Sequence, residues 1–496
     1  MTNEELLLTA QHIEQHRHAT WRPDPYYLEG LKRDPGDIRI NQAYGMFLMR
    51  RGQFAEAEKH FRTAIKRLTW RSPNPYDSEP YYNQGLVLFY QNKKEEAYDA
   101  FYKAAWTNAQ QEMSYYYLAC IACGDGEYEH ALELVEHSLV KNSHNVKARG
   151  LKAVLLRKLN RTEEAVNLRA ENLELDAFDY VTLFENVLME KDANEFQERS
   201  RGFYKTYLQT ARDYAEYGCL EEAICVLKSC AVQQPMIYYY QAYYQQKLEE
   251  NSKDIIDTLY EKAEQCIPDY CFPNKLEDIA VLEHTITANP KGAKAYYYLG
   301  NLYYDKLQYD RAIALWEESI MLDASYPTAH RNLAIAYYNK RKDAEAARKE
   351  LEQAFALDKT DSRVFLELDQ LYKKLGVSFA ERLKQYEAWE ALIRERDDAM
   401  LEWVTLYNLN SEPQKAYDLI MSHFFRPWEG AEGRISGQYK IALTALAREA
   451  MQQNDYERAE QLLKQALQYP AHLGEGRLEG TKDNDIYYEL GVVQEY

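Results

Sequence analysis

The chain has 496 residues, of which 46% are hydrophobic and 28% are charged, and its formal net charge is −19. This composition is that of a folded protein rather than a disordered one. The acidic balance argues against nucleic acid and anionic membranes as partners, because both attract basic surfaces. No apolar run approaches the roughly 18 residues that a membrane span requires. A single core does not grow to this length without division or repetition.

The seven cysteines and eleven histidines give little sign of metal or redox chemistry. Cys120 and Cys123 form a C-x-x-C pair, but no second pair at zinc-ligand spacing accompanies it, so buried packing is the favoured interpretation. His12 and His16 lie four residues apart with no third ligand in view, and we interpret them as surface residues. We therefore expect no metal, no cofactor and a reducing, cytoplasmic location.

The first 35 residues are expected to form two helices, over 5–16 and 26–34, and the second of them belongs to an incomplete repeat. From residue 36 onward, helix-length amphipathic patterns recur. The small residues Ala97, Ala131 and Ala165, which we place where two helices cross, are each 34 residues apart. This period is that of the tetratricopeptide repeat, a pair of antiparallel helices.

The clearest repeat runs from Ala293 to Tyr326 and contains two amphipathic helices. One face of the first carries Tyr296, Leu299, Gly300 and Tyr303, and one face of the second carries Ala312, Trp316 and Ser319. Neither helix can bury its apolar stripe alone, so each pair must stack on its neighbours. The sequence therefore predicts an all-α fold, a right-handed superhelical solenoid of tetratricopeptide helix-turn-helix repeats.

The repeats divide the chain into four regions. Residues 1–35 hold the N-terminal helices and the partial repeat, and residues 36–235 hold an array whose pattern becomes irregular near 177–202. Residues 236–292 look helical but degenerate, which suggests a bend. Residues 293–496 form a second array with two long glycine-rich loops.

First helices of such repeats line the concave side, which commonly holds an extended peptide or another domain. Residues one position after the packing residues are expected on this inner face: Tyr82, Tyr116, Tyr297, Asn301, Tyr304, Arg331, Tyr338 and Asn339. The competing interpretation is that the tyrosines only pack against neighbouring helices. Asn301, Asn332 and Arg363 occupy positions of a known carboxylate clamp. Tyr297 and Leu366 replace its other members, so we expect no chaperone-tail binding.

The two long loops, 424–438 and 470–485, hold six of the 20 glycines and exceed the usual length of turns between repeats. They should emerge on one edge of the solenoid and offer Arg426, Trp428, Glu429, Glu432, Arg434, His472, Glu475 and Arg477. One interpretation is that they only cover the open end, and the other is a polar site or docking edge. Glu429 and Glu475 are a weak candidate for an acid/base pair. No nucleotide-binding, hydrolase or metalloprotease motif is present, so no catalytic residue is predicted.

The segments ANPKGAKAYYYLGNLYYDKLQYDRAIALWEESI, RPWEGAEGR and YPAHLGEGRLEG resemble the C-terminal region of large bacterial tetratricopeptide proteins. The N-terminal half of those proteins is a β-rich, aldose-epimerase-like domain of uncharacterised function. The resemblance covers the chain from about Lys32 onward. It implies a role linked to carbohydrate metabolism, and we expect this chain to be a portion of a longer polypeptide.

Two functional hypotheses follow. The first is a non-catalytic interaction scaffold that binds a protein segment, or the β-rich domain of the same polypeptide, through the inner face and the loop edge. The alternative is a carbohydrate-binding or carbohydrate-active protein whose site is completed by the two loops. A spacer that only fixes geometry within an assembly is a third possibility.

Overall fold

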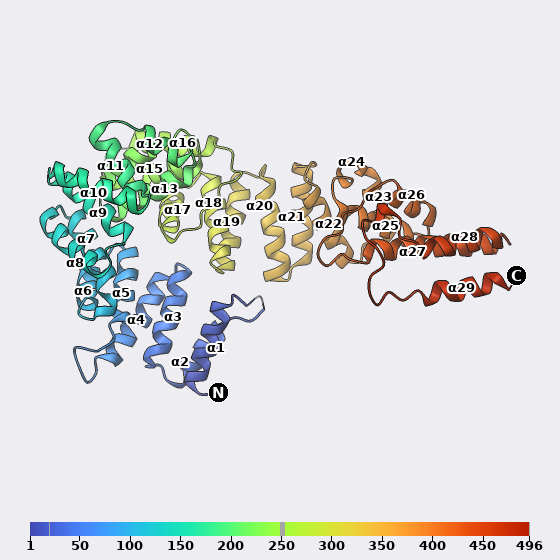
Figure 1. Cartoon of the computed structure of the whole chain (residues 1–496), viewed down its shortest axis with the longest axis horizontal. Helices are drawn as coiled ribbons and strands as arrows, with labels where there is room; N and C mark the ends of the chain where they lie inside the picture. The colour runs from blue at the N-terminus through green and yellow to red at the C-terminus, as the bar shows by residue number, and fades with distance from the viewer. Residues whose placement is uncertain (19, 249–252, 496) are drawn as a thin grey trace. The chain divides into compact units, whose positions relative to one another are not determined.

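The computed structural model describes residues 1–18, 20–248 and 253–495. These residues form helices and connecting turns, with no β-strand in the described ranges, and they divide into two compact units, 1–322 and 323–496. Within each unit, successive helices run antiparallel to their chain neighbours (Figure 1). The predicted all-α repeat fold is confirmed. None of the described helices is long and apolar enough to cross a membrane.

The first unit contains the helices that precede residue 323. They are α1 (Asn3–Gln15), α2 (Asp24–Arg33), α3 (Ile38–Arg50), α4 (Phe54–Leu68), α5 (Glu79–Tyr90), α6 (Lys94–Ala104), α7 (Gln111–Gly124), α8 (Tyr128–Lys141), α9 (Val146–Lys158), α10 (Thr162–Leu175), α11 (Tyr180–Glu190), α12 (Asn194–Ser200), α13 (Tyr204–Glu216), α14 (Leu220–Lys228), α15 (Pro235–Leu248), α16 (Lys253–Gln265), α17 (Leu276–Ala288), α18 (Ala293–Asp305) and α19 (Tyr309–Leu322). The irregular segment 177–202 forms α11 and α12, and the degenerate segment 236–292 contributes α15, α16 and α17.

The second unit begins with a helix that ends in a π-helical turn, η2 (Tyr337–Arg341). Its α-helices are α20 (Pro327–Ala336), α21 (Ala344–Leu357), α22 (Ser362–Lys374), α23 (Phe379–Ala388), α24 (Glu390–Ile393), α25 (Asp397–Leu409), α26 (Pro413–Met421), α27 (Arg434–Gln452), α28 (Tyr456–Ala466) and α29 (Asn484–Gln494). Because α27 begins at Arg434, the first long loop is shorter than its expected range of 424–438. The second contains a short 3₁₀ helix, Ala471–Leu473.

A close contact between a glycine and an aromatic side chain sixteen residues later recurs in three repeats. The pairs are Gly45 with Phe61, Gly85 with Phe101, and Gly300 with Trp316. In each pair, a Cβ atom added to the glycine would lie 2.5 to 2.7 Å from a ring atom. The two helices of a pair can therefore approach closely only because the first one lacks a side chain at this position.

The turns within the pairs repeat with the same period. Asn92, Gly126 and Asn160 each stand between the two helices of a pair, and each has a left-handed backbone, with φ of 60°, 83° and 57°. They are 34 residues apart in the sequence. Glycine and asparagine adopt this conformation more readily than other residues, which explains why the sequence places them here.

The first unit curls until segments far apart in the sequence meet. The Gln308 side-chain amide donates to the Arg51 carbonyl over 2.7 Å, across 257 residues. A Cβ atom on Gly52 would collide with Ile279. The Tyr116 hydroxyl donates to Glu216 Oε1 over 2.5 Å, across 100 residues. The inner side of this unit is consequently a space bounded by helices from several repeats.

Part of the high tyrosine content fills the core. Among the described residues, ten of the twelve largest fully buried side chains are tyrosines. Many of their hydroxyls donate to carboxylates, as in the pairs Tyr27–Glu14, Tyr214–Glu185, Tyr239–Glu264, Tyr240–Asp278 and Tyr386–Asp369. A buried tyrosine needs a hydrogen-bond partner for its hydroxyl, and in these pairs an acid supplies it.

Candidate functional site

Two of the tyrosines expected on the exposed inner face are buried instead. Tyr116 is fully buried, and its hydroxyl is bonded to Glu216 across the interior of the first unit. Tyr297 is 6% exposed, and its carbonyl accepts a hydrogen bond from the Trp316 indole. The expectation that these two side chains face a partner is therefore wrong, because the curl of the unit and the neighbouring helix cover them.

The other expected inner-face residues of the first unit are only partly covered. Tyr82 is half-buried, with its ring 6.4 Å from that of Tyr117. Asn301 Oδ1 accepts from the Trp316 indole over 3.1 Å, and the Tyr304 ring lies 5.3 Å from that of Trp316. Asn301 and Tyr304 thus also stabilise the packing between α18 and α19.

In the second unit, the structure brings Tyr338 and Asn339 together at a small pocket. Tyr338 and Asn339 stand on the π-turn η2 and, with Glu367 and Lys374 of α22, line a cavity of about 220 Å³. Lys374 Nζ lies 4.7 Å from the centre of the Tyr338 ring. The expected residue Arg331 donates to Glu367 through both Nε and Nη2, over 2.7 and 2.5 Å. Turns of this type often occur at functional positions.

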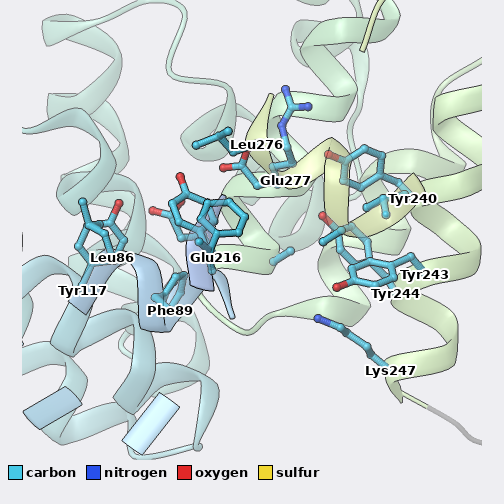
Figure 2. Close-up of a pocket in the computed structure, with 16 residues that line it drawn as sticks. Leu86, Phe89, Tyr117, Glu216, Tyr240, Tyr243, Tyr244, Lys247, Leu276 and Glu277 are labelled. Atoms are coloured by element: carbon cyan, nitrogen blue, oxygen red, sulfur yellow. The ribbon is translucent and has the colours of Figure 1, made fainter. Parts of the chain in front are cut away.

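A second candidate site is a cavity of about 140 Å³ on the inner side of the first unit, which we call the aromatic pocket. Its walls come from α4, α5, α7, α13, α15 and α17. The aromatic residues that line it are Phe54, Phe89, Tyr90, Tyr117, Tyr240, Tyr243 and Tyr244. Figure 2 shows Leu86, Phe89 and Tyr117 on one side and Tyr240, Tyr243 and Tyr244 on the other.

The rings of the pocket are fixed by contacts with one another. Phe54 stacks on Tyr90 with ring centres 4.9 Å apart, and Phe89 meets Tyr117 edge-on at 5.5 Å. On the opposite wall, Tyr244 lies 5.6 Å from Tyr240. Offset and edge-on pairs of this kind stabilise each ring in one orientation. The pocket is therefore preformed by side chains of four different helices.

Two ion-pair groups border the pocket. Arg212 donates to Asp278 Oδ1 over 3.3 Å, and Asp278 also accepts the Tyr240 hydroxyl over 2.5 Å. Lys147 Nζ lies 3.5 Å from Asp213 Oδ1 and 3.3 Å from Glu216 Oε1. One lysine thus serves two carboxylates, which leaves this second group with an excess of negative charge.

The tyrosines beside these acids are difficult to ionise. Burial, and after it the nearby charge of Glu216, raises the pKa of Tyr82 to about 12. Burial also raises the pKa of Tyr90, with additional contributions from Glu277 and Glu216. Burial raises the pKa of the Asp213 carboxyl to about 6, although Lys147 acts in the opposite direction. The negative charge on this side of the cavity is therefore carried by the carboxylates, and the neighbouring tyrosine rings stay neutral.

None of the residues expected on the inner face lines the aromatic pocket. Much of one wall comes from α15 and α17, in the segment 236–292 where the repeat pattern degenerates. The available signal was the tyrosine cluster Tyr238 to Tyr244, YYYQAYY, which is too rich in aromatics for a core stripe of one helix. Its aromatic partners on α4, α5 and α7 lie far earlier in the chain, and no local pattern indicates that pairing.

The two long loops of the second unit do lie against each other. The Phe425 backbone N–H donates to the His472 carbonyl over 2.9 Å, and a Cβ atom on Gly474 would collide with the Phe425 carbonyl. Glu475 accepts from the backbone N–H groups of Gly433 and Ser436 over 2.8 and 3.0 Å. Glu475 therefore caps the beginning of α27 and is not available as an acid/base partner of Glu429.

The remaining loop-edge residues are mostly directed to solvent. Trp428 is 39% exposed, and Arg426, Glu429, Glu432 and Arg434 are exposed. The Arg477 guanidinium lies 3.2 Å from Asp483, and His472 is half-buried. The loops thus combine a packed base with an exposed polar rim, and the rim contains one large aromatic side chain.

No group of three or more ligand-type side chains that could hold a metal occurs in the described part of the chain. Cys120 and Cys123 are buried. Cys123 Sγ lies 3.9 Å from Cys219 Sγ, on the other side of the interior of the first unit. The rings of His12 and His16 lie on the exterior, tilted by 48° with centres 4.3 Å apart.

Comparisons with known proteins identify the class of repeat. A family model described as a tetratricopeptide repeat matches residues 45–112 and 444–495, and a second, described as a TPR repeat, matches residues 300–341. These matches fall in both units. These three stretches are thus similar to tetratricopeptide repeats, and stacked helical repeats in general create extended concave binding surfaces.

Three solved structures show some similarity to this chain. Naa15/Naa10 bound to HypK-THB shows 13% identity over 99% of this chain and 78% of that chain, with a TM-score of 0.28. The pilF protein of Pseudomonas aeruginosa shows 17% identity over 44% of this chain and 89% of that chain, with a TM-score of 0.26. YrrB, described as a TPR protein with an unusual peptide-binding site, shows 14% identity over 48% of this chain and 97% of that chain, with a TM-score of 0.20.

Proposed function

We propose that the chain is an interaction scaffold that binds a segment of a protein partner, with the aromatic pocket anchoring one of the partner's side chains. The observation that carries this proposal is the preformed pocket of about 140 Å³ on the inner side of the first unit. Rigid aromatic walls lose little conformational entropy on binding, so they suit the anchor of an extended segment. The exposed side chain of Lys247 at the rim gives the cavity access to solvent.

A selection from a displayed library of random dodecapeptides tests this proposal on the full chain. Enriched peptides should bind the wild type and lose at least about tenfold in affinity to Ala280→Leu, which fills the pocket. Ala314→Leu, on an exposed position of α19, is the matched control and should bind like the wild type. Peptides that bind both variants equally well would contradict an anchor in this pocket.

A narrower proposal names the partner as a β-rich, aldose-epimerase-like domain of the same polypeptide, docking on the edge formed by the loops 424–438 and 470–485. It is supported by the resemblance of RPWEGAEGR and YPAHLGEGRLEG and by the exposed Trp428 and Phe424, since exposed aromatics mark docking surfaces. Calorimetric titration with a separately produced domain should show binding that Trp428→Ala weakens. Absence of heat with the wild type would contradict this partner.

The second candidate function is carbohydrate binding at the same edge, linked to carbohydrate metabolism. The specific support is an exposed aromatic, Trp428, next to the exposed acid Glu429 and near Arg434. A glycan array should then show signals for the wild type that Arg434→Ala removes. We also propose a cytoplasmic location, which the seven unpaired cysteines favour. Secretion with native disulfides would contradict the location.

A further inference from the structure

The acidic groups around the aromatic pocket outnumber the cations that neutralise them. Asp278 is paired with Arg212, while Asp213 and Glu216 share Lys147. Glu277, in the first turn of α17, lines the pocket and has no ion-pair partner among the described residues. The side of the cavity formed by α13 and α17 is therefore short of positive charge.

Two facing walls of the same cavity carry aromatic side chains. Phe89 and Tyr117 lie on one wall, and Tyr243 and Tyr244 lie on the other (Figure 2). Aromatic faces attract cations through the ring quadrupole, most strongly where water is displaced. An ammonium or guanidinium group between these rings would thus gain from both the rings and the carboxylates.

We propose that the aromatic pocket binds a cationic side chain, the ammonium of a lysine or the guanidinium of an arginine, from a basic segment of a partner. The inference rests on the proposed function and specifies the chemistry of the partner. The carboxylates of Glu216 and Glu277 supply the charge, and the rings surround the methylene stem. The net charge of −19 also favours the binding of a basic segment, because it attracts basic partners over longer distances.

Two cations of the chain itself also line the pocket, and the Arg212 guanidinium carbon lies 5.8 Å from the centre of the Tyr240 ring. Arg212 is bonded to Asp278 and to Gln209 Oε1, which hold it at the base of α17. Lys247 is exposed, and its Nζ lies 4.4 Å above the Tyr243 ring at the rim. Lys247 shows that the aromatic wall can hold an ammonium group. Because the Lys247 ammonium would repel a cationic guest, we expect Lys247→Ala to strengthen the binding of such a guest.

The test uses n-butylammonium as a lysine side-chain probe and n-butanol as its neutral counterpart, both measured by ligand-observed NMR with the full chain. We expect n-butylammonium to bind about tenfold more tightly than n-butanol. Raising the salt concentration should weaken the binding of n-butylammonium and leave the binding of n-butanol unchanged. Equal affinities for the two probes would overturn the proposal.

Glu277→Gln should lower the affinity for n-butylammonium about fivefold, with no change for n-butanol. The matched control is Glu221→Gln, because Glu221 is the second residue of α14 as Glu277 is of α17, and it lies outside the pocket. This control reproduces the loss of an acid near a helix N-terminus and should leave both affinities unchanged. An equal loss in the two variants would overturn a direct contact with Glu277.

The peptides selected from the library separate this inference from the proposed function. Peptides that need the open pocket and carry lysine or arginine at a fixed position support both. A second outcome is that the selected peptides need the open pocket but carry no lysine or arginine at a fixed position. If the two probes also bind equally well, this result contradicts the cationic guest but agrees with the proposed scaffold function. The absence of any peptide lost in Ala280→Leu overturns the anchor itself.

Discussion

Replacing Gly85 with alanine tests how the two helices of a repeat are held together. Gly85 lies on α5, and a Cβ atom there would lie 2.7 Å from both Cδ1 and Cε1 of Phe101 and 3.0 Å from Cγ. Phe101 is fully buried, so its ring cannot move aside without displacing its neighbours. The added methyl group must therefore separate α5 from α6 or force the ring from its rotamer.

The expected magnitude comes from two opposing effects. Alanine in place of glycine stabilises a helix interior by about 1 kcal/mol. Overpacking a tight core costs about 1–3 kcal/mol, and contacts of 2.7 Å with two ring atoms place this site in the upper part of that range. We expect a net loss of about 1–2 kcal/mol for Gly85→Ala. Gly437 on α27 has open space around its missing Cβ, so Gly437→Ala should instead gain about 0.5–1 kcal/mol.

Hydrogen exchange followed by mass spectrometry is the suitable assay, because two units need not unfold in one step. Gly85→Ala should speed exchange of the α5 and α6 amides about tenfold, and Gly437→Ala should slow exchange in α27. Adding Phe101→Leu to Gly85→Ala should recover part of the loss, with a coupling energy of about 1 kcal/mol. Slower exchange in α5 and α6 after Gly85→Ala would refute the close-contact explanation.

Three further changes address buried polar groups. The pKa of Asp213 is raised to about 6 from 3.8, so the folded chain holds its proton more tightly and loses stability as pH rises through this interval. Asp213→Asn should therefore stabilise the chain by about 1–2 kcal/mol at pH 7, and this gain should vanish near pH 4. Urea denaturation measures the gain at each pH, and a gain that does not depend on pH would contradict this explanation. Arg382 is 1% exposed and forms ion pairs with Asp369 and Glu402. Arg382→Met leaves both carboxylates without this partner, so it should lower the free energy of unfolding in denaturant by about 3 kcal/mol or more. A loss below about 1 kcal/mol would contradict the importance of these ion pairs. The side-chain nitrogen and oxygen of Gln42 are both buried without a hydrogen-bond partner among the described residues. Gln42→Met should therefore stabilise the chain by about 1 kcal/mol, which a higher melting temperature would reveal. A lower melting temperature would show that the amide is satisfied.

The repeat architecture could be predicted because each repeat carries its own local signal. The alanines spaced by 34 residues mark where helices cross, and Gly85 and Phe101 mark the tight contact inside one pair. Antiparallel stacking then follows, because an amphipathic helix pair has no other way to bury its stripes. Local periodicity, however, carries no information on how strongly successive pairs rotate.

The aromatic pocket depends on that rotation, which is why the sequence did not indicate it. Tyr117 and Tyr244 face each other only because the first unit curls, and the same curl buries Tyr116. The loops of the second unit show a different limit. Their positions on one edge followed from the order of the helices, but the role of Glu475 depends on where α27 begins, at Arg434.

Photo-crosslinking tests most directly whether a partner segment occupies the inner side of the first unit. The photoreactive residue p-benzoylphenylalanine replaces Tyr243 in the aromatic pocket or, as a control, the exposed Tyr102 on α6. Peptides selected from the library should crosslink at position 243 and not at position 102. Crosslinks at position 102 alone, or equal yields at the two positions, would contradict binding in the pocket.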